Sequence, residues 1–393
     1  MIYTSDQLQQ AQNDFVGVVV RETSTRAAGP TRGQIFGSPA AESVAKYYAG
    51  MRPYWYPVLP LDELPDDKPA GVELLGERVV LAYLNGDIVA LQDLCRHYQA
   101  PLSLGEIVEW NGSQCLMCPY HGWTYDRGGQ CVRIPQLEAS RSIPHEARVP
   151  AYRAEERYGL VWVCLEEEAR FELPDFPEFD DVSFHRGPLR SYEPYRASAV
   201  RCIMGSLDDT HYPWVHEGYL GVRSQPEPPE HEVWRDGRTM ISRYEVVQPR
   251  SVLTMDTSAL QGPAGNGGGT GEPELERVTY TNHVAMPNVI RLVKDINSRT
   301  QLVIWMATCP HRYDWTSTFW QMVRNYDTDP GRDPEYERFA DTVREQDRPI
   351  WEGQRPWLLP PFWTKVEMPL RPADLPLVEY QKWLEELDIA LDI

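Results

Sequence analysis

The chain has 393 residues, of which 42% are hydrophobic, enough apolar surface for about two domains with buried cores. Its formal net charge of −20 argues against nucleic acid and anionic membranes as partners, because phosphate contacts need lysine or arginine. The first residues lack the basic start and apolar run of a signal peptide, and no apolar stretch is long enough to span a bilayer. We therefore expect a cytoplasmic protein with no membrane or nucleic-acid partner.

The first 185 residues divide by composition into three parts. Residues 1–50 are mixed and polar, and form an N-terminal segment. Residues 51–167 contain short β-type runs: "VELLGERVVLAYLNGDIVALQD" predicts strands joined by a hairpin turn at Asn85-Gly86, and "YGLVWVCL" predicts another strand. Residues 168–185 are acidic and contain prolines, as is typical of a linker.

The remaining segment, residues 186–393, mixes strands with helices. Runs such as "RYEVVQP" and "LVIWMATC" predict strands, whereas "DPEYERFADTVREQDRPIWEGQ" and "VEYQKWLEELDIAL" predict helices near the end of the chain. Residues 262–274, "GPAGNGGGTGEPE", predict a flexible loop and lack the strand and helix context of a dinucleotide site. We expect an α+β fold: an all-β domain, then a domain built on an antiparallel sheet with helices on one face.

Two cysteine–histidine pairs carry the strongest chemical signal. Cys95 and His97 form a C-x-H pair, and Cys118 and His121 form a C-x-x-H pair. Thiolate and imidazole together select zinc or an iron–sulfur cluster. A structural zinc site usually places its two cysteines in one pair and its two histidines in another. Pairs that mix the two residue types suit a cluster in which two thiolates hold one iron and two imidazoles hold the other.

The residues around these pairs resemble a known family. "CRHYQAPLSLGEI" followed by "CPYHGWTYDRGGQCVRIP" is similar to the Rieske segment of the Rieske non-haem iron oxygenases. The resemblance implies that Cys95, His97, Cys118 and His121 bind a 2Fe-2S Rieske cluster within an all-β Rieske domain. It also implies that residues 186–393 form a catalytic helix-grip domain, and it disfavours the zinc interpretation.

A second histidine pair lies in "SLDDTHYPWVHEG". On a straight helix, His211 and His216 would point about 140° apart and could not bind one metal ion. Pro213 lies between them and breaks such a helix. The family resemblance implies that His211 and His216 bind a mononuclear Fe(II) ion. It further implies that Asp208 bridges this ion to a cluster histidine.

A facial triad of two histidines and one carboxylate still needs an acid. The candidates on the predicted downstream helix are Asp341, Glu345 and Asp347. "VREQDRPIWEGQ" resembles the ligand helix of the phthalate-type branch of the family, and this resemblance favours Asp347. Met204 stands where many members carry asparagine, so we expect it to contact the substrate and make the pocket more apolar.

The resemblance implies a terminal oxygenase in a homotrimer, with residues 1–50 packed on the catalytic domain or at the trimer interface. Electrons would come from NAD(P)H through a separate flavin and iron–sulfur reductase or a ferredoxin. The expected reaction uses O2 to hydroxylate or oxidatively demethylate an aromatic or heterocyclic small molecule. The alternatives are a cis-dihydroxylating arene dioxygenase and a Rieske electron-transfer protein with a ligand-binding domain.

Overall fold

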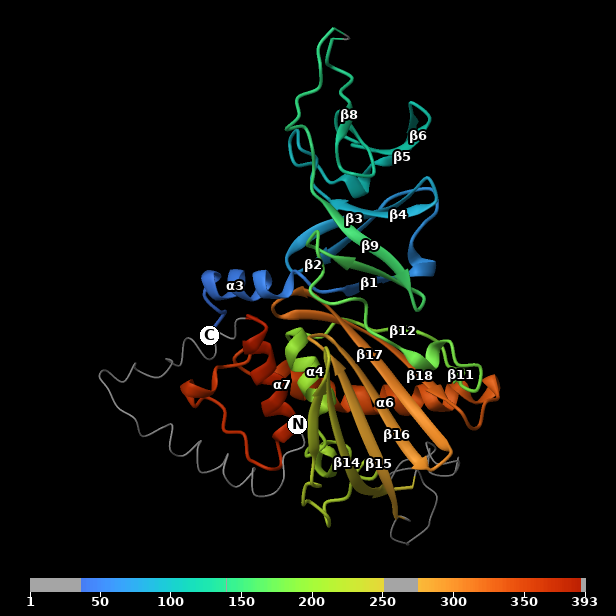
Figure 1. The fold of residues 1–393 in the computed structure, drawn as a ribbon, viewed down its shortest axis with the longest axis vertical. Helices are drawn as coiled ribbons and strands as arrows, with labels where there is room; N and C mark the ends of the chain where they lie inside the picture. The colour runs from blue at the N-terminus through green and yellow to red at the C-terminus, as the bar shows by residue number, and fades with distance from the viewer. Residues whose placement is uncertain (1–36, 139, 251–274, 390–393) are drawn as a thin grey trace, which may run out of the picture.

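The computed structural model describes residues 37–138, 140–250 and 275–389, so the predicted loop at 262–274 and residues 1–36 lie outside the described residues. Figure 1 shows two parts arranged along the long axis of the molecule. The helices are α3 (Ala41–Met51), α4 (Ala199–Leu207), α5 (Tyr212–Val215), α6 (Asp333–Gly353) and α7 (Leu375–Glu386).

The strands of the first part are β1 (Tyr56–Pro60), β2 (Ala70–Leu74), β3 (Glu77–Leu84), β4 (Asp87–Gln92), β5 (Glu106–Trp110), β6 (Ser113–Met117), β7 (Thr124–Tyr125), β8 (Cys131–Arg133), β9 (Ala151–Arg157) and β10 (Leu160–Cys164). Those of the second part are β11 (His185–Arg186), β12 (Arg190–Ser191), β13 (Glu232–Asp236), β14 (Thr239–Pro249), β15 (Leu275–Ala285), β16 (Val289–Asn297), β17 (Thr300–Arg312) and β18 (Trp315–Arg324).

The first part contains two antiparallel sheets. One has six strands in the order β1-β10-β9-β4-β3-β2, and the other has four in the order β5-β6-β7-β8. The predicted hairpin is confirmed: β3 and β4 pair directly, and Asn85 and Gly86 both have positive φ, as a two-residue turn of this kind requires. The strand expected in "YGLVWVCL" is β10, which is fully buried.

The second part is an eight-stranded antiparallel sheet in the order β11-β18-β17-β16-β15-β14-β13, and β12 also pairs with β18. Alternate residues of its long strand β17 face opposite sides, since side chains alternate along a strand. Leu302 packs with Tyr336 and Phe339 of α6. Trp305, on the other side, packs against Trp162 of β10 with ring centroids 6.1 Å apart. One face of the sheet therefore carries α6, and the other contacts the first part.

The acidic stretch expected to be a linker is packed against the catalytic sheet. Phe176 is buried and stacks on Trp305 with centroids 5.2 Å apart, and Glu178 forms an ion pair with Arg291 of β16. The α+β prediction is confirmed, with an all-β first part and a sheet-and-helix second part. Within the described ranges, no helix is long and apolar enough to cross a membrane.

Candidate metal centres

Two loops beside the four-stranded sheet bring the two cysteine–histidine pairs together. Cys95 follows β4, and the backbone N–H of Cys95 donates to Ala100 O at 2.9 Å, which closes the first loop. Cys118 follows β6, and its N–H donates to Trp123 O at 2.8 Å, which closes the second. Gly122 has φ of +72°, a backbone conformation that favours glycine, so this tight turn depends on it.

The two imidazoles face each other at the tips of these loops. The Nδ1 atoms of His97 and His121 are 3.1 Å apart, and Trp123 stacks on His97 with ring centroids 4.7 Å apart. Both thiols are buried, and burial is the main cause of the raised pKa of Cys95. The two histidines are only partly buried, so the imidazole side of this pocket is the side closer to solvent.

Tyr125 is a contact to the pocket that the sequence motif did not reveal. Its hydroxyl lies 3.2 Å from the Sγ of Cys95 and accepts a hydrogen bond from Arg96 N–H at 3.1 Å. Because the Arg96 N–H donates to the phenolic oxygen of Tyr125, the phenolic proton remains free to point to the sulfur of Cys95. A hydrogen bond to a ligating sulfur raises the reduction potential of an iron–sulfur cluster.

The four donors form two like pairs. The imidazoles of His97 and His121 face each other, and the thiols of Cys95 and Cys118 are both buried. One pair of thiolates and one pair of imidazoles suit the two separate irons of a 2Fe-2S cluster. Among the described residues, one other set of metal-binding side chains brings its ligand atoms within 4.8 Å of one another.

The group that does converge consists of His211, His216 and Asp347. His211 and His216 flank α5, a one-turn helix that begins at Tyr212 and contains Pro213, so they do not share a straight helix. Their Nε2 atoms lie 3.1 Å apart. On a straight helix the two imidazoles would point about 140° apart. Here the short helix α5 turns the backbone, and both imidazoles point to a common position.

Asp347 approaches this position from the middle of α6. Its Oδ1 lies 3.1 Å from the Nε2 of His216 and 3.5 Å from the Nε2 of His211. The other two candidate acids point elsewhere: Glu345 pairs with arginines on its own helix, and Asp341 lies 3.8 Å from Arg190. Two imidazoles and one carboxylate on one side of a position are the donor set that non-haem Fe(II) prefers.

Close packing of α4 on α6 sets the position of Asp347. A Cβ atom at Gly205 of α4 would lie less than 3 Å from the indole of Trp351, which is one helical turn after Asp347. The glycine therefore lets the two helices approach, and α4 leads directly into the segment that carries the histidines.

Hydrogen bonds orient both histidines of this site. The Nδ1 of His211 donates to Asp208 Oδ2 at 3.0 Å, and the Nδ1 of His216 donates to Gln346 Oε1 at 2.8 Å. Asp208 also accepts from the backbone N–H and hydroxyl of Thr210 at 2.9 and 2.7 Å. With Nδ1 protonated, each Nε2 keeps its lone pair for a metal. Gln346 was not anticipated from the sequence.

The electrostatics of the site also suit a cation. Burial alone would lower the pKa of His211, but hydrogen bonds with Asp208 and Asp347 outweigh burial and raise this pKa to about 9. Burial would raise the pKa values of Asp208 and Asp347, yet their contacts with the histidines lower both. The two carboxylates that favour a proton on His211 equally favour a divalent metal ion in its place.

A mostly apolar cavity adjoins the converging group. Together with its mouth, which opens to solvent, the cavity holds about 550 Å³ of empty space. Its lining consists of Tyr212, Leu220, Tyr280, Leu292, Lys294, Ile304, Trp320, Met322, Phe339, Ala340 and Val343. Met204 lies instead in a different cavity, together with Phe362 and Asp374, so its expected contact with the substrate has no support from this geometry.

The chain carries a pocket of two thiols and two imidazoles, and a second site of two imidazoles and one carboxylate. These two donor sets are those of a metalloprotein with two iron centres. Comparisons with known proteins agree. Residues 54–152 match the Rieske 2Fe-2S domain family, and residues 197–388 match the vanillate O-demethylase oxygenase C-terminal domain family.

Individual relatives cover most of the chain. It is 31% identical over 345 residues to methylxanthine N1-demethylase NdmA of Pseudomonas putida, which covers 86% of this chain and 89% of that protein. The structure of Pseudomonas putida CBB5 NdmA with caffeine superposes with a TM-score of 0.72 at 28% identity, over 87% of this chain and 92% of that one. Dicamba monooxygenase bound to dicamba shares the fold, with a TM-score of 0.66 at 20% identity over 86% of this chain and 97% of that one.

The chain belongs to the Rieske non-haem iron oxygenases, as an oxygenase (alpha) component. It is therefore an oxidoreductase, and its cofactors are a 2Fe-2S Rieske cluster and a mononuclear iron ion. Members of the family are parts of multicomponent systems that receive electrons from a reductase or ferredoxin.

Proposed function

We propose that this protein is a terminal monooxygenase that hydroxylates, or removes an O- or N-methyl group from, a small aromatic or heteroaromatic molecule. The observation that carries the proposal is the position of Asp347, which joins two histidines beside a mostly apolar cavity lined by Tyr212 and Val343. The similarity to methylxanthine demethylases over 86% of the chain supports the same reaction class.

The proposed ligands follow from the geometry of each site. Cys95, His97, Cys118 and His121 would hold the 2Fe-2S cluster, and His211, His216 and Asp347 would hold the mononuclear iron. When bound, these two centres supply stored electrons and the activation of dioxygen, respectively.

The protein side chains have separate tasks. Asp208 and Gln346 fix the protonation and orientation of the ligand histidines. The apolar wall of the cavity excludes water and holds the substrate ring, so that the reacting carbon is the one nearest the metal ligands.

Delivery of electrons is proposed to occur between subunits of a homotrimer. Within one chain, the six-stranded sheet lies between the four-stranded sheet beside the cluster pocket and the catalytic sheet (Figure 1). Tyr98 and Tyr120, next to the two cluster histidines, are 71% and 64% exposed, a usual feature of a surface that binds a partner. Asp208 is partly exposed and would accept a hydrogen bond from a cluster histidine of a neighbouring subunit.

We propose the domain boundaries that were expected from the sequence. Residues 51–167 would form the Rieske domain, residues 168–185 the connection, and residues 186–393 the catalytic domain. Residues 37–50, the described part of the N-terminal segment, contact the catalytic sheet: Tyr48 accepts a hydrogen bond from the backbone N–H of Tyr313 at 3.0 Å.

The decisive experiment tracks oxygen from labelled O2 into product. Purified protein, an NADH-dependent reductase and a panel of methoxy-aromatics, N-methyl-heteroaromatics and unsubstituted arenes are incubated, and products are identified by mass spectrometry. Monooxygenation predicts one labelled oxygen in an alcohol, or formaldehyde with a demethylated product. Two labelled oxygens in a diol would establish cis-dihydroxylation instead, and a reduced cluster without any oxygenated product would indicate an electron carrier.

Transfer between subunits has its own test. Asp208→Asn should retain iron at both centres and slow single-turnover oxidation of the reduced cluster by about 10- to 100-fold. Inactive Cys95→Ala and Asp347→Ala chains, denatured and refolded together, should recover activity in mixed trimers. No recovery in mixtures that contain both chains would place the transfer within one chain.

A further inference from the structure

Lys294 is a buried lysine in the wall of the cavity beside the proposed iron site. Its side chain is 2% exposed, and the register of β16 sets it opposite Tyr280 of β15 and Leu302 of β17. Burial of an ammonium group is costly unless the group is paired and hydrogen-bonded. A lysine at this position therefore calls for a partner.

Within the described part of the protein, Lys294 has a nearby carboxylate but no hydrogen-bond acceptor. The nearest carboxylate oxygen, Oε1 of Glu276, is 3.7 Å from Nζ, which is too long for a hydrogen bond. No described residue offers Nζ an acceptor at hydrogen-bond distance. Glu276 instead accepts a hydrogen bond from Gln248 Nε2 at 3.2 Å, and Gln248 accepts one from the Tyr280 hydroxyl at 3.0 Å. Since an ammonium carries three N–H donors, Lys294 retains donors for another molecule.

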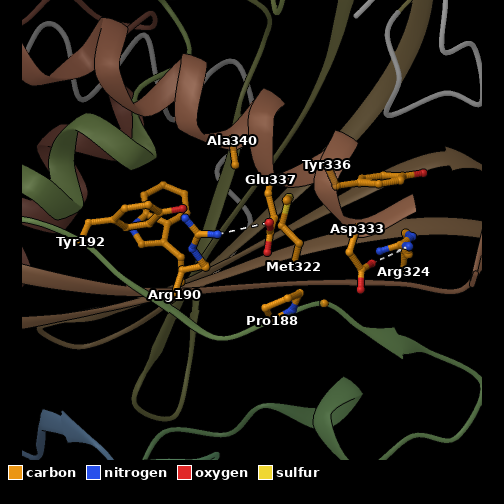
Figure 2. A pocket seen from close by; sticks show the side chains of 11 residues that line it. Pro188, Arg190, Tyr192, Met322, Arg324, Asp333, Tyr336, Glu337 and Ala340 are labelled. Atoms are coloured by element: carbon orange, nitrogen blue, oxygen red, sulfur yellow. Dashed lines mark ion pairs between the residues drawn. The ribbon is translucent and has the colours of Figure 1, made fainter. Parts of the chain in front are cut away.

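A neighbouring cavity shows the contrast. It shares Trp320, Met322 and Ala340 with the first cavity and is drawn in Figure 2. The charged groups labelled there are paired within the protein: Arg190 with Glu337 at 3.2 Å, and Arg324 with Asp333 at 2.8 Å. Lys294 has no such close partner, so the two cavities differ in what they offer a ligand.

Lys294 and the neighbours of the proposed metal ligands line the same cavity. Tyr212 directly follows His211, and Val343 lies one helical turn before Asp347. Apart from the two tyrosine hydroxyls, the indole N–H of Trp320 and Lys294, the lining side chains are apolar. A ring that fills the cavity would meet one charged donor and the edge of the iron site at the same time.

We propose that Lys294 donates a hydrogen bond to a carbonyl oxygen of a neutral aromatic or heteroaromatic substrate, and thereby selects the carbon that faces the iron ligands. This inference rests on the proposed function and names the substrate class for the same site. A single charged donor in an apolar wall fixes the orientation of a ring, because any other placement leaves the donor unpaired.

The charge of the site favours a neutral substrate over a carboxylate. Glu276 already balances Lys294, so an anionic ligand would add a second negative charge beside Glu276 in an apolar cavity. Burial lowers the pKa of Lys294 to about 8, and Glu276 partly offsets this effect. At pH 7 most of the lysine is therefore protonated and able to donate.

The test measures binding, independently of turnover. Dissociation constants are determined by calorimetry on the iron-loaded, anaerobic protein for three probes: 1-methyl-2-quinolone, 1-methylindole and 4-methoxybenzoate. These are a neutral ring with a carbonyl, a neutral ring without one, and a carboxylate. The wild type should bind the quinolone at least about ten-fold more tightly than the indole, as expected for a hydrogen bond from a charged donor.

Four variants test the role of Lys294 in this preference. Lys294→Met should abolish it, and Lys294→Gln, which keeps a neutral donor, should retain part of it. Lys68→Met is the control, because Lys68 is an exposed lysine outside the cavity, and it should keep the preference. Glu276→Gln should strengthen binding of 4-methoxybenzoate, since it removes the competing negative charge.

The proposal is overturned if Lys294→Met keeps the preference for the quinolone, or if none of the probes binds more tightly than the indole. It is also overturned if the wild type prefers 4-methoxybenzoate and Lys294→Met loses that preference, which would assign an anionic substrate. Absence of labelled product with every compound, with the binding preference intact, would instead refute the monooxygenase function and leave the recognition by Lys294 standing.

Discussion

The two metal centres are built in opposite ways. The cluster pocket is made by two loops that follow β4 and β6, and backbone hydrogen bonds such as Cys95 N–H to Ala100 O close each loop on itself. The proposed iron site joins a short segment after α4 to a residue in the middle of α6, far along the chain. Its ligands meet because two helices and a sheet pack together.

The ligands of the two centres also differ in their exposure to solvent. His97 and His121 are only partly buried, whereas His216 is 1% exposed and Asp347 is buried. A centre that receives electrons from another protein needs an accessible edge, and a centre that activates oxygen needs protection from water. Local loop closure therefore suffices for the first task, while the second requires tertiary packing.

The largest effect is expected from Asp347→Ala. Loss of the carboxylate should remove the mononuclear iron and lower product formation by more than about 100-fold, beyond the usual effect of changing an outer hydrogen-bond partner. Iron should fall from about three to about two per chain, and the visible spectrum of the cluster should persist. Glu345→Ala is the control on the same helix and should stay active. An active Asp347→Ala with an inactive Glu345→Ala would refute the ligand assignment.

Cys95→Ala should disrupt the cluster pocket and leave the iron site in place. Removal of this thiolate opens one iron of the cluster, so the visible absorption should be lost and about one iron per chain should remain. Because the iron site depends on other elements, Asp347 and its histidines should still bind metal, which can be checked by the magnetic resonance signal of the iron–nitric oxide adduct. Visible absorption that survives in both Cys95→Ala and His121→Ala would refute the Rieske assignment of these ligands.

Gly205→Ala tests whether the iron site depends on helix packing. The added methyl would overlap the Trp351 indole, and overpacking of this kind typically costs about 1–3 kcal/mol. We expect a lower free energy of unfolding and weaker retention of the mononuclear iron, with the cluster spectrum unchanged. Gly353→Ala, on the same helix as Trp351, meets nothing within 4 Å and serves as the control. Equal iron retention in both variants would show that α4–α6 packing does not control the site.

The smallest effect concerns Lys294 and stability. Its folded pKa of about 8 is below the usual value of 10.5, because burial disfavours the charge. The unfolded chain therefore binds more protons between these two values, so the cost of burial is complete below pH 8 and is relieved as pH rises toward 10.5. Tyr212 and Tyr280, the other titratable groups of this wall, have pKa values raised by burial and stay neutral there.

The measurement is the free energy of unfolding by urea at pH 7 and pH 10. Lys294→Met should be more stable than the wild type at pH 7, by on the order of 1 kcal/mol after the loss of attraction to Glu276. The difference should shrink at pH 10. A variant that is less stable than the wild type at pH 7 would show that the Lys294–Glu276 contact is structural.

Much of the cluster pocket could be predicted from the sequence, because its residues are close together and its loops close locally. The strand pattern around Asn85-Gly86 and the α+β fold followed from side-chain periodicity and turn chemistry, which depend on neighbouring residues. Tyr125 escaped prediction, since its contact with Cys95 joins β7 to a loop 30 residues earlier in the chain.

The tertiary structure decided the rest. The sequence offered Asp341, Glu345 and Asp347 on one helix, and only the packing of α6 against α4 and the sheet shows which of them faces His211 and His216. The same packing placed Met204 in a separate cavity and Lys294 beside the iron site. These outcomes depend on contacts between segments far apart in the chain, and no local pattern of residues encodes which faces of those segments meet.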